Sequence, residues 1–257
     1  MGTKVGEIMS KDPISVMEGD FVTRSRQLIR DNQLRGLPIT NGSGDVVGIV
    51  TDRDMLKIDS TRSNVTVSGF SVEAPMITPD TDVEEAAKLL LRANYALLPV
   101  VRSPEDRRLQ GVVSPIDIFK SIDPEKLAQR TAEDIMNTET KTCNPQDSVA
   151  KVWDSMLDSD FTGMPVVDDK GRPVGMITRF DILRTGSARI GKDTTYAMKV
   201  EKLMRSPLYS VGPKANLRDA SKLMLDRGIG RISVVDDGKL AGIIDRYDVI
   251  KAIFGEE

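Results

Sequence analysis

Hydrophobic and polar positions follow one pattern four times along this chain. Each copy contains a glycine, two apolar residues and a polar residue, and it closes three residues later on an aspartate. The copies lie at residues 48–54, 111–117, 175–181 and 242–248. Their closing aspartates are 63, 64 and 67 positions apart. A repeat of nearly constant length indicates that one structural unit has been used four times.

The hydrophobic pattern upstream of each copy predicts the rest of the unit. A second apolar run, with a proline in three repeats and Ser233 in the fourth, lies 15 to 18 residues before the aspartate. Before that run, apolar residues recur at i, i+3 and i+4, which predicts a helix. Thr81 and Glu84 indicate a capping box for one of these helices, and Asn216 is the predicted N-cap of another. Short strands are predicted before the helices, at residues 14–16, 76–77, 141–143 and 209–211.

The unit therefore consists of strand, helix, strand, turn, strand and helix. Turn-forming residues separate the last two strands at 41–44, 168–171 and 236–238, which favours an antiparallel hairpin. The helix between the first two strands favours a parallel pair. The predicted fold class is α/β (α+β), with four repeats that each form a small three-stranded sheet with two helices.

A unit of about 60 residues buries too little surface to be stable alone, so the repeats are expected to pair. The predicted repeats are 1–60, 61–123, 124–188 and 189–257. They are expected to pair into two modules, 1–123 and 124–257. The polar segment 123–131, which contains Pro124, is the predicted boundary between the modules.

Composition narrows the range of functions. The chain has 36 basic and 39 acidic residues, a formal net charge of −3, which does not favour a nucleic-acid-binding surface. It has no histidine and one cysteine, which argues against a catalytic triad or a structural zinc site. Cys143 falls in a predicted strand and is expected to be a core thiol. Without a long apolar run or a secretory signal, the expectation is a cytoplasmic protein with no membrane insertion.

The pattern of Leu-Pro-Val-Val, then Gly-apolar-apolar-Thr/Ser-x-x-Asp, then a short helix, resembles the CBS domain, which is named after cystathionine beta-synthase. Four copies in register look like two tandem Bateman modules, each a pair of CBS repeats. The architecture is similar to the gamma subunit of AMP-activated protein kinase and to stand-alone archaeal CBS proteins. The resemblance implies a non-catalytic regulatory protein. Such a protein would bind an adenine nucleotide (AMP, ADP or ATP) or an adenosyl compound between paired repeats and report energy or metabolite status to a partner.

The resemblance also implies which residues bind the sugar. The closing aspartate of each copy would accept hydrogen bonds from the ribose hydroxyls, and the hydroxyl residue three positions earlier would contact sugar or phosphate. The implied ribose residues are Asp54, Asp117, Asp181 and Asp248. The implied hydroxyl residues are Thr51, Ser114 and Thr178. In the fourth copy Asp245 replaces the hydroxyl, and a carboxylate there would repel a phosphate.

Arginines are the predicted phosphate ligands, because a guanidinium group can donate two hydrogen bonds to one phosphate. They are Arg35, Arg53, Arg179, Arg231 and Arg246. The second repeat has Ala96, Leu97 and Pro115 instead, so it has little to hold a phosphate. The base is expected between the first strand and the Leu-Pro segment. The predicted base pocket includes Ser15, Pro38, Thr142, Pro165 and Ser210.

Each assignment has a structural alternative. An aspartate in the first turn of a helix is often only a favourable N-terminal charge, and a proline is often confined to a strand edge. Three functions stay open: a ligand-sensing regulator, an interaction module that binds no ligand, and an enzyme of phosphoryl chemistry. The enzyme is disfavoured because no general base faces a nucleophile. The sequence does not choose between a kinase, a transporter and another enzyme as the partner, or between a monomer and a homodimer.

Overall fold

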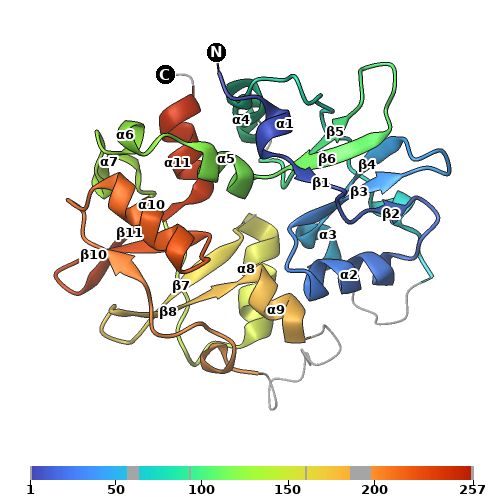
Figure 1. The fold of residues 1–257 in the computed structure, drawn as a ribbon. Coiled ribbons are helices and arrows are strands. Elements are labelled where there is room, and N and C mark those ends of the chain that lie inside the picture. Colours follow the sequence, from blue (N-terminus) through green and yellow to red (C-terminus); the bar gives the residue numbers. More distant parts are fainter. Residues whose placement is uncertain (1, 57–63, 93, 160, 186–197, 256–257) are drawn as a thin grey trace. The chain divides into compact units, whose positions relative to one another are not determined.

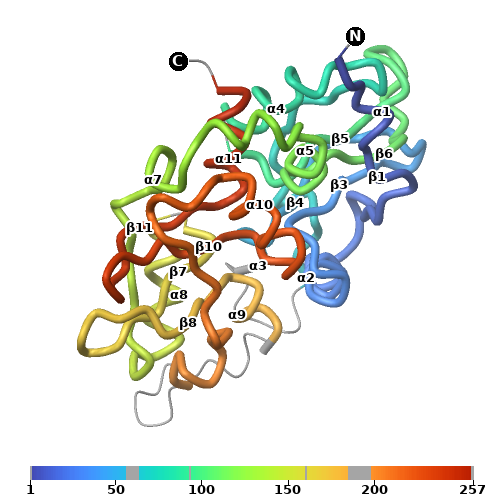
Figure 2. The backbone as a smooth tube through the Cα atoms, turned by 60° about the vertical axis from the view of Figure 1, so that its left-hand side comes forward, coloured from blue at the N-terminus to red at the C-terminus, as the bar shows by residue number. Residues whose placement is uncertain are grey.

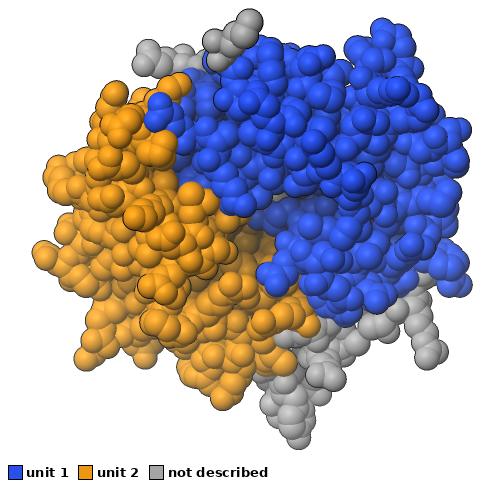
Figure 3. Space-filling model, viewed as in Figure 1, with its two compact units in different colours: residues 1–55, 62–123, 249–257 blue, residues 56–61, 124–248 orange. Residues whose placement is uncertain are grey.

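The computed structural model describes residues 2–56, 64–92, 94–159, 161–185 and 198–255. Within these residues each repeat forms a small sheet flanked by helices, which confirms the predicted fold class (Figure 1). The chain divides into two compact units (Figure 3). Unit 1 comprises residues 1–55, 62–123 and 249–257, and unit 2 comprises 56–61 and 124–248. The repeat and module boundaries proposed from the sequence remain predictions.

The first two repeats have the predicted order of strand, helix and hairpin, and each also begins with a short helix. The elements of the first repeat are α1 (Val5–Ile8), β1 (Ser10–Lys11), β2 (Val16–Met17), α2 (Val22–Asp31), β3 (Gly36–Thr40), β4 (Val46–Thr51) and α3 (Asp52–Leu56). Those of the second are the 3-10 helix η1 (Val67–Phe70), α4 (Val83–Arg92), β5 (Leu98–Val101), β6 (Leu109–Val113) and α5 (Pro115–Ser121).

The last two repeats follow the same order. The elements of the third are α6 (Pro124–Leu127), α7 (Ala132–Ile135), α8 (Val149–Ser159), β7 (Gly163–Val167), β8 (Pro173–Thr178) and α9 (Arg179–Thr185). Those of the fourth are the 3-10 helix η3 (Val200–Lys202), β9 (Ser210–Val211), α10 (Leu217–Asp226), β10 (Arg231–Asp236), β11 (Lys239–Asp245) and α11 (Arg246–Phe254).

Strand pairing agrees with the predicted topology. The last two strands of every repeat form an antiparallel hairpin, namely β3–β4, β5–β6, β7–β8 and β10–β11. The first strand pairs in parallel with the second at β2–β3 and β9–β10. In the second and third repeats only Ile77 and Cys143 make this pairing. The strand is short because the next residue, Thr78 or Asn144, already begins the turn that leads into the helix.

The helix caps agree with the sequence at one of two positions. Asn216 caps α10, and its side chain accepts the N–H of Arg218, as predicted. The predicted capping box of Thr81 and Glu84 is wrong, because α4 begins only at Val83. The Thr81 hydroxyl instead accepts the N–H of Thr78 at 3.1 Å and closes the preceding turn.

The segment that enters each repeat pairs with the other repeat of its unit, which the sequence pattern did not predict. In unit 1, β1 runs antiparallel to β6 and forms the edge of the second repeat's sheet (Figure 2). The other entering segments make single antiparallel bridges. The four opposed pairs are Ser10–Val112, Val72–Ile49, Asn137–Ile243 and Arg205–Met176. Within each unit the two repeats therefore exchange edge segments.

This exchange explains the glycine at the start of each copy. The entering segment crosses directly over that glycine, so a side chain would collide with the crossing backbone. A Cβ on Gly111 would lie 2.8 Å from the carbonyl oxygen of Ser10, and one on Gly175 would lie 2.9 Å from that of Arg205. Close approach of a second backbone is a common reason for glycine inside a strand.

Candidate functional site

The predicted ribose aspartates lie at four helix starts, with the same geometry in the first three repeats. The residue before the helix, Thr51, Ser114 or Thr178, donates its backbone N–H to Oδ2 of the aspartate three positions later. These distances are 3.0, 2.8 and 2.9 Å. The hydroxyl of the same residue donates to the same oxygen at 2.6, 2.6 and 2.5 Å. The structure therefore brings each predicted hydroxyl and aspartate together.

These bonds make each aspartate a helix cap, the structural alternative to ribose binding. Capping occupies Oδ2, whereas a carboxylate has two oxygens and about four acceptor positions. Asp54 and Asp181 are only 5% and 1% exposed, so two of these carboxylates are held almost out of water. The cap therefore orients the carboxylate and is compatible with a second role for its other oxygen.

The second repeat keeps the cap but has apolar residues where others have cations. Pro115 occupies the first position of α5, where its missing N–H costs nothing. Leu97 and Ala96 face Gly36 of the first repeat, where a Cβ would lie 3.3 and 3.6 Å from them. Leu97 is buried in a small apolar cluster. This part of unit 1 offers contacts to an apolar group rather than to a phosphate.

The fourth repeat has two carboxylates at its helix start. The N–H of Asp245 donates to Asp248 Oδ2 at 2.7 Å, and Asp245 Oδ1 accepts the N–H groups of Tyr247 and Asp248 at 2.8 and 3.2 Å. Burial and the Asp245 carboxylate raise the pKa of Asp248 to about 7, against a weaker opposing attraction from Arg231. Near neutral pH this carboxyl is therefore partly protonated and is a poorer acceptor for sugar hydroxyls.

The raised pKa of Asp248 makes the stability of unit 2 depend on pH. The folded protein holds this proton more tightly than the unfolded chain, so the stabilisation is complete below the ordinary pKa and is lost as the pH rises toward 7. Asp245→Asn keeps an oxygen for both N–H groups but removes the neighbouring charge. We expect this variant to raise the melting temperature more at pH 8 than at pH 5. Equal increases at both pH values in thermal unfolding would contradict this role of Asp245.

Two predicted phosphate arginines reach outward from strand ends. Arg35 Nε donates to Asp52 Oδ2 at 2.7 Å, and the arginine stays 43% exposed. Arg231 extends from the fourth repeat to the third, where it donates to the hydroxyl of Thr162 and lies over Gly163. Figures 1 and 2 show the corresponding strands, β7 and β10, beside each other. In unit 2, Arg231 therefore lies at the junction of the two repeats.

The three arginines inside the copies are more enclosed. Arg179 is 3% exposed and Arg53 is partly buried. Arg246 donates from Nη2 to the carbonyl oxygen of Ile229 at 3.1 Å. Phosphate binding by these three arginines stays a prediction.

The segments of the predicted base pocket lie beside each other in the sheets. Pro38 and Pro165 are buried in β3 and β7, and Ser15 directly precedes β2. Thr142 and Ser210 are exposed on the first-strand segments of their repeats. The parallel pairing brings each first strand against the Leu-Pro strand, or its counterpart. Binding of a base between them remains a prediction.

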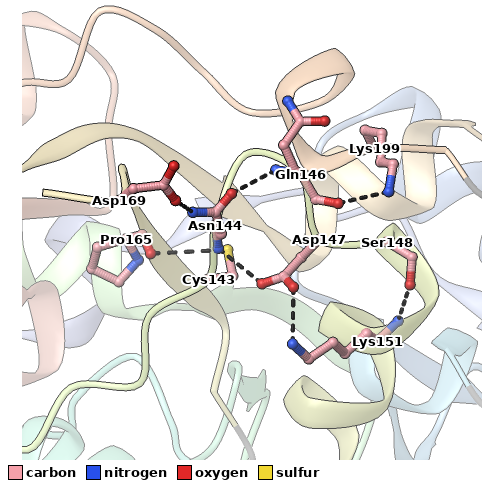
Figure 4. A network of polar contacts seen from close by, with 9 residues as sticks. All are labelled: Cys143, Asn144, Gln146, Asp147, Ser148, Lys151, Pro165, Asp169 and Lys199. Carbon is pink, nitrogen blue, oxygen red and sulfur yellow. Dashed lines mark hydrogen bonds and ion pairs between the residues drawn. The ribbon is translucent and has the colours of Figure 1, made fainter. Parts of the chain in front are cut away.

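A polar network fixes the first-strand segment of the third repeat (Figure 4). The N–H of Cys143 donates to the carbonyl oxygen of Pro165 at 3.1 Å. Asn144 donates its N–H to Asp147 at 2.9 Å and its amide to Asp169 at 2.8 Å. Cys143 is buried, as predicted for a core thiol, and burial raises the pKa of this thiol to about 12. The segment beside Pro165 is therefore held by both backbone and side-chain bonds.

Sequence reasoning missed three residues around these helix starts. Asp52 is 4% exposed, and its carboxylate forms an ion pair with Arg35. Thr162 accepts the hydrogen bond of Arg231. Arg205, in the segment that enters the fourth repeat, donates from Nε to Asp181 Oδ1 at 3.0 Å. All three occupy positions at which the repeats differ from one another, so the repeat pattern contained no signal for them.

Two negative findings apply to the described residues. None of the helices described by the structure is long and apolar enough to cross a membrane. In the same residues, no three histidine, cysteine, aspartate or glutamate side chains come together as a group that could hold a metal ion.

Comparison with known proteins gives one family for the whole chain. A family model described as the CBS domain matches residues 5–60, 67–124, 132–187 and 200–255. The uncharacterized protein MJ1404 of Methanocaldococcus jannaschii is 28% identical over 262 residues, which cover 97% of this chain. The present chain spans 61% of the length of MJ1404.

A solved structure is similar over nearly the whole chain. MJ1225 of M. jannaschii, described as a candidate archaeal homologue of g-AMPK, has a crystal structure that matches with a TM-score of 0.83 and 22% identity. The match covers 96% of this chain and 99% of that chain, and at this identity it supports the fold alone.

CBSX2, a chloroplastic CBS domain-containing protein of Arabidopsis thaliana, is 32% identical over 133 residues, which cover 42% of this chain and 56% of CBSX2. It has been crystallised in complex with AMP. That structure covers 48% of this chain and 94% of its own, with a TM-score of 0.42.

Proposed function

The chain belongs to the CBS-domain family, and from this premise we propose that it is a non-catalytic regulatory protein that binds an adenine nucleotide or a related adenosyl compound. The ligand would lie at the helix starts between the paired repeats of one unit. Its ribose hydroxyls would donate to the closing aspartates, and its phosphates would meet nearby arginines. Binding would be reported to a partner protein.

The burial of Asp54 and Asp181 is the observation that carries this proposal. Capping alone does not require a buried charge, as α7 shows. There Asp134 caps the helix in the same way, accepting the N–H and hydroxyl of Thr131 at 2.6 and 2.8 Å, yet it is exposed. Removing a carboxylate from water is costly unless other groups satisfy it. Sugar hydroxyls are donors that could replace the groups that satisfy such a carboxylate in this structure, such as Arg205 at Asp181 Oδ1.

The four helix starts are not equivalent as nucleotide sites. The first and third repeats combine a hydroxyl, a buried aspartate and an arginine within the same unit. The second repeat lacks the arginines, and the fourth has Asp245 in place of the hydroxyl. We therefore assign nucleotide binding first to Asp54 and Asp181. The AMP complex of the relative CBSX2 supports adenylates as the ligand class.

Regulation requires that the ligand bind two arrangements of the protein with different affinity. In each copy, the helix start directly follows the last strand of the repeat. The entering segment of the other repeat in the same unit crosses that strand. A ligand at the helix start would therefore touch elements of both repeats in one unit. Such a ligand can favour one packing of the two repeats over another, and a partner that binds only one packing would detect the change.

A second candidate function is an interaction module that binds no nucleotide. The observation in its favour is that each closing aspartate already completes a helix cap. In that case the four copies would be structural, and the protein would bind its partner equally with and without adenylates.

Isothermal titration calorimetry with AMP, ADP, ATP and S-adenosylmethionine tests the proposal. The wild type is expected to bind at least one of them. Asp54→Asn combined with Asp181→Asn should weaken binding by about tenfold or more, because each amide keeps a capping oxygen but loses the charge that strengthens the bonds to the sugar.

Asp134→Asn is the matched control, since it changes a cap of the same geometry outside the four copies and should leave affinity unchanged. If no ligand gives a binding signal, or if the double variant binds as well as the wild type, the module that binds no nucleotide is the better account.

A further inference from the structure

Arg205 occupies the oxygen of Asp181 that the cap does not use. Its Nε donates to Asp181 Oδ1 at 3.0 Å. The N–H and the hydroxyl of Thr178 both donate to Oδ2. The side chain of Arg205 is 51% exposed, whereas that of Asp181 is 1% exposed. A surface cation therefore satisfies the carboxylate oxygen that a ribose diol would need.

This contact distinguishes the third repeat from the first. Arg205 lies opposite Met176, and in unit 1 the residue in the same place is Val72, opposite Ile49. Met176 and Ile49 each stand five residues before the aspartate of their copy. The same backbone arrangement therefore presents a cation to the third repeat and an apolar side chain to the first. The first repeat's outward arginine, Arg35, bonds to Asp52.

We propose that Arg205 determines ligand specificity in the third repeat by favouring 5′-phosphorylated adenosyl ligands over the uncharged nucleoside. This inference rests on the proposed function. A ribose that bonds to Asp181 Oδ1 displaces the guanidinium group of Arg205. A 5′-phosphate offers the displaced guanidinium a new anion, to which it can donate two hydrogen bonds. Adenosine offers only water in exchange for a charge-assisted bond to a buried carboxylate.

The exposure of Arg205 makes such a displacement feasible. Half of its side chain is already in water, so the guanidinium group can turn away from Asp181 into solvent without displacing core side chains. Asp181 cannot follow, because the cap holds its other oxygen at 2.5 and 2.9 Å. When a ligand binds, the guanidinium group of Arg205 therefore moves away and the carboxylate of Asp181 stays in place. A contact that selects between ligands requires this behaviour.

Calorimetric titration with adenosine and with AMP tests this inference, using an Asp54→Asn background to weaken the first repeat. The measured quantity is the ratio of the adenosine dissociation constant to the AMP dissociation constant. Arg205→Met removes the cation and keeps an unbranched side chain of similar length. We expect it to lower that ratio by about tenfold, through tighter adenosine binding, weaker AMP binding or both.

Arg172→Met is the matched control. Arg172 is similarly exposed and pairs with Asp168 at 2.7 Å in the turn between β7 and β8, so its loss should leave the ratio unchanged. AMP binding with an unchanged or higher ratio in Arg205→Met would overturn the role of Arg205 while leaving the proposed function intact. If neither the wild type nor the Asp54→Asn protein binds AMP, this inference is rejected, and the proposed function is rejected with it only if ADP, ATP and S-adenosylmethionine also fail to bind.

Discussion

Asp181→Ala is expected to lower the free energy of unfolding of unit 2 by about 3 kcal/mol. The substitution leaves the N–H and the hydroxyl of Thr178 without their acceptor and removes the anion that Arg205 faces. At 1% exposure of the aspartate, water does not readily replace those bonds. Removal of one partner from a buried network is among the costlier single changes in a protein. Chemical denaturation followed by circular dichroism measures the loss.

The control for this prediction is Asp134→Ala, which removes an equivalent cap from α7. Asp134 accepts the same two donors from Thr131, but it is exposed, so water can replace it. We expect a clearly smaller loss of stability than at Asp181. Equal losses at the two positions would mean that the carboxylate of Asp181 is only a cap and that its burial and the Arg205 contact add nothing.

Gly175→Ala should destabilise unit 2 by about 2 kcal/mol, as overpacking of a tightly packed position usually does. The added methyl group would lie 2.9 Å from the carbonyl oxygen of Arg205 and 3.0 Å from the sulfur of Met204. The backbone oxygen cannot turn aside as a flexible side chain can. The entering segment must therefore move off β8, and its bridge between Arg205 and Met176 is weakened.

Gly212→Ala is the matched control, because a Cβ at Gly212 meets no atom within 4 Å and the residue has no left-handed backbone. Thermal or chemical unfolding of the two variants compares them directly. Similar stability for both would show that the exchange of entering segments does not make the glycine of each copy necessary.

The sequence predicted the strands, the longer helices and the hairpin of each repeat, but not the short helix near its start, which is α1, η1, α7 or η3. Repetition of the apolar runs predicted strand, helix and hairpin in each repeat, and turn residues such as those at 168–171 set the hairpins in register. The sequence also predicted that Thr178 and Asp181 lie close together, because residues three positions apart both fall at one helix start. These features depend on local patterns that every copy contains.

Features that depend on contacts between repeats could not be predicted in this way. The glycine of each copy is recognisable from the sequence, but the segment that crosses it comes from the other repeat, and hydrophobic periodicity contains no information about that partner. Arg205 and Asp52 belong to no repeated pattern, since their role arises from where the backbone places them. The predicted capping role of Thr81 is wrong because its hydroxyl accepts the N–H of Thr78 in the turn that precedes the helix.

The central claim is most directly tested by a crystal structure of the protein grown with millimolar AMP. The account predicts a nucleotide in the first or third repeat, with its ribose hydroxyls within hydrogen-bonding distance of Asp54 or Asp181. In the third repeat, Arg205 should have left Asp181 for the phosphate. Only solvent beside both aspartates, with the Arg205 contact unchanged, would contradict the assignment of these helix starts as adenylate sites.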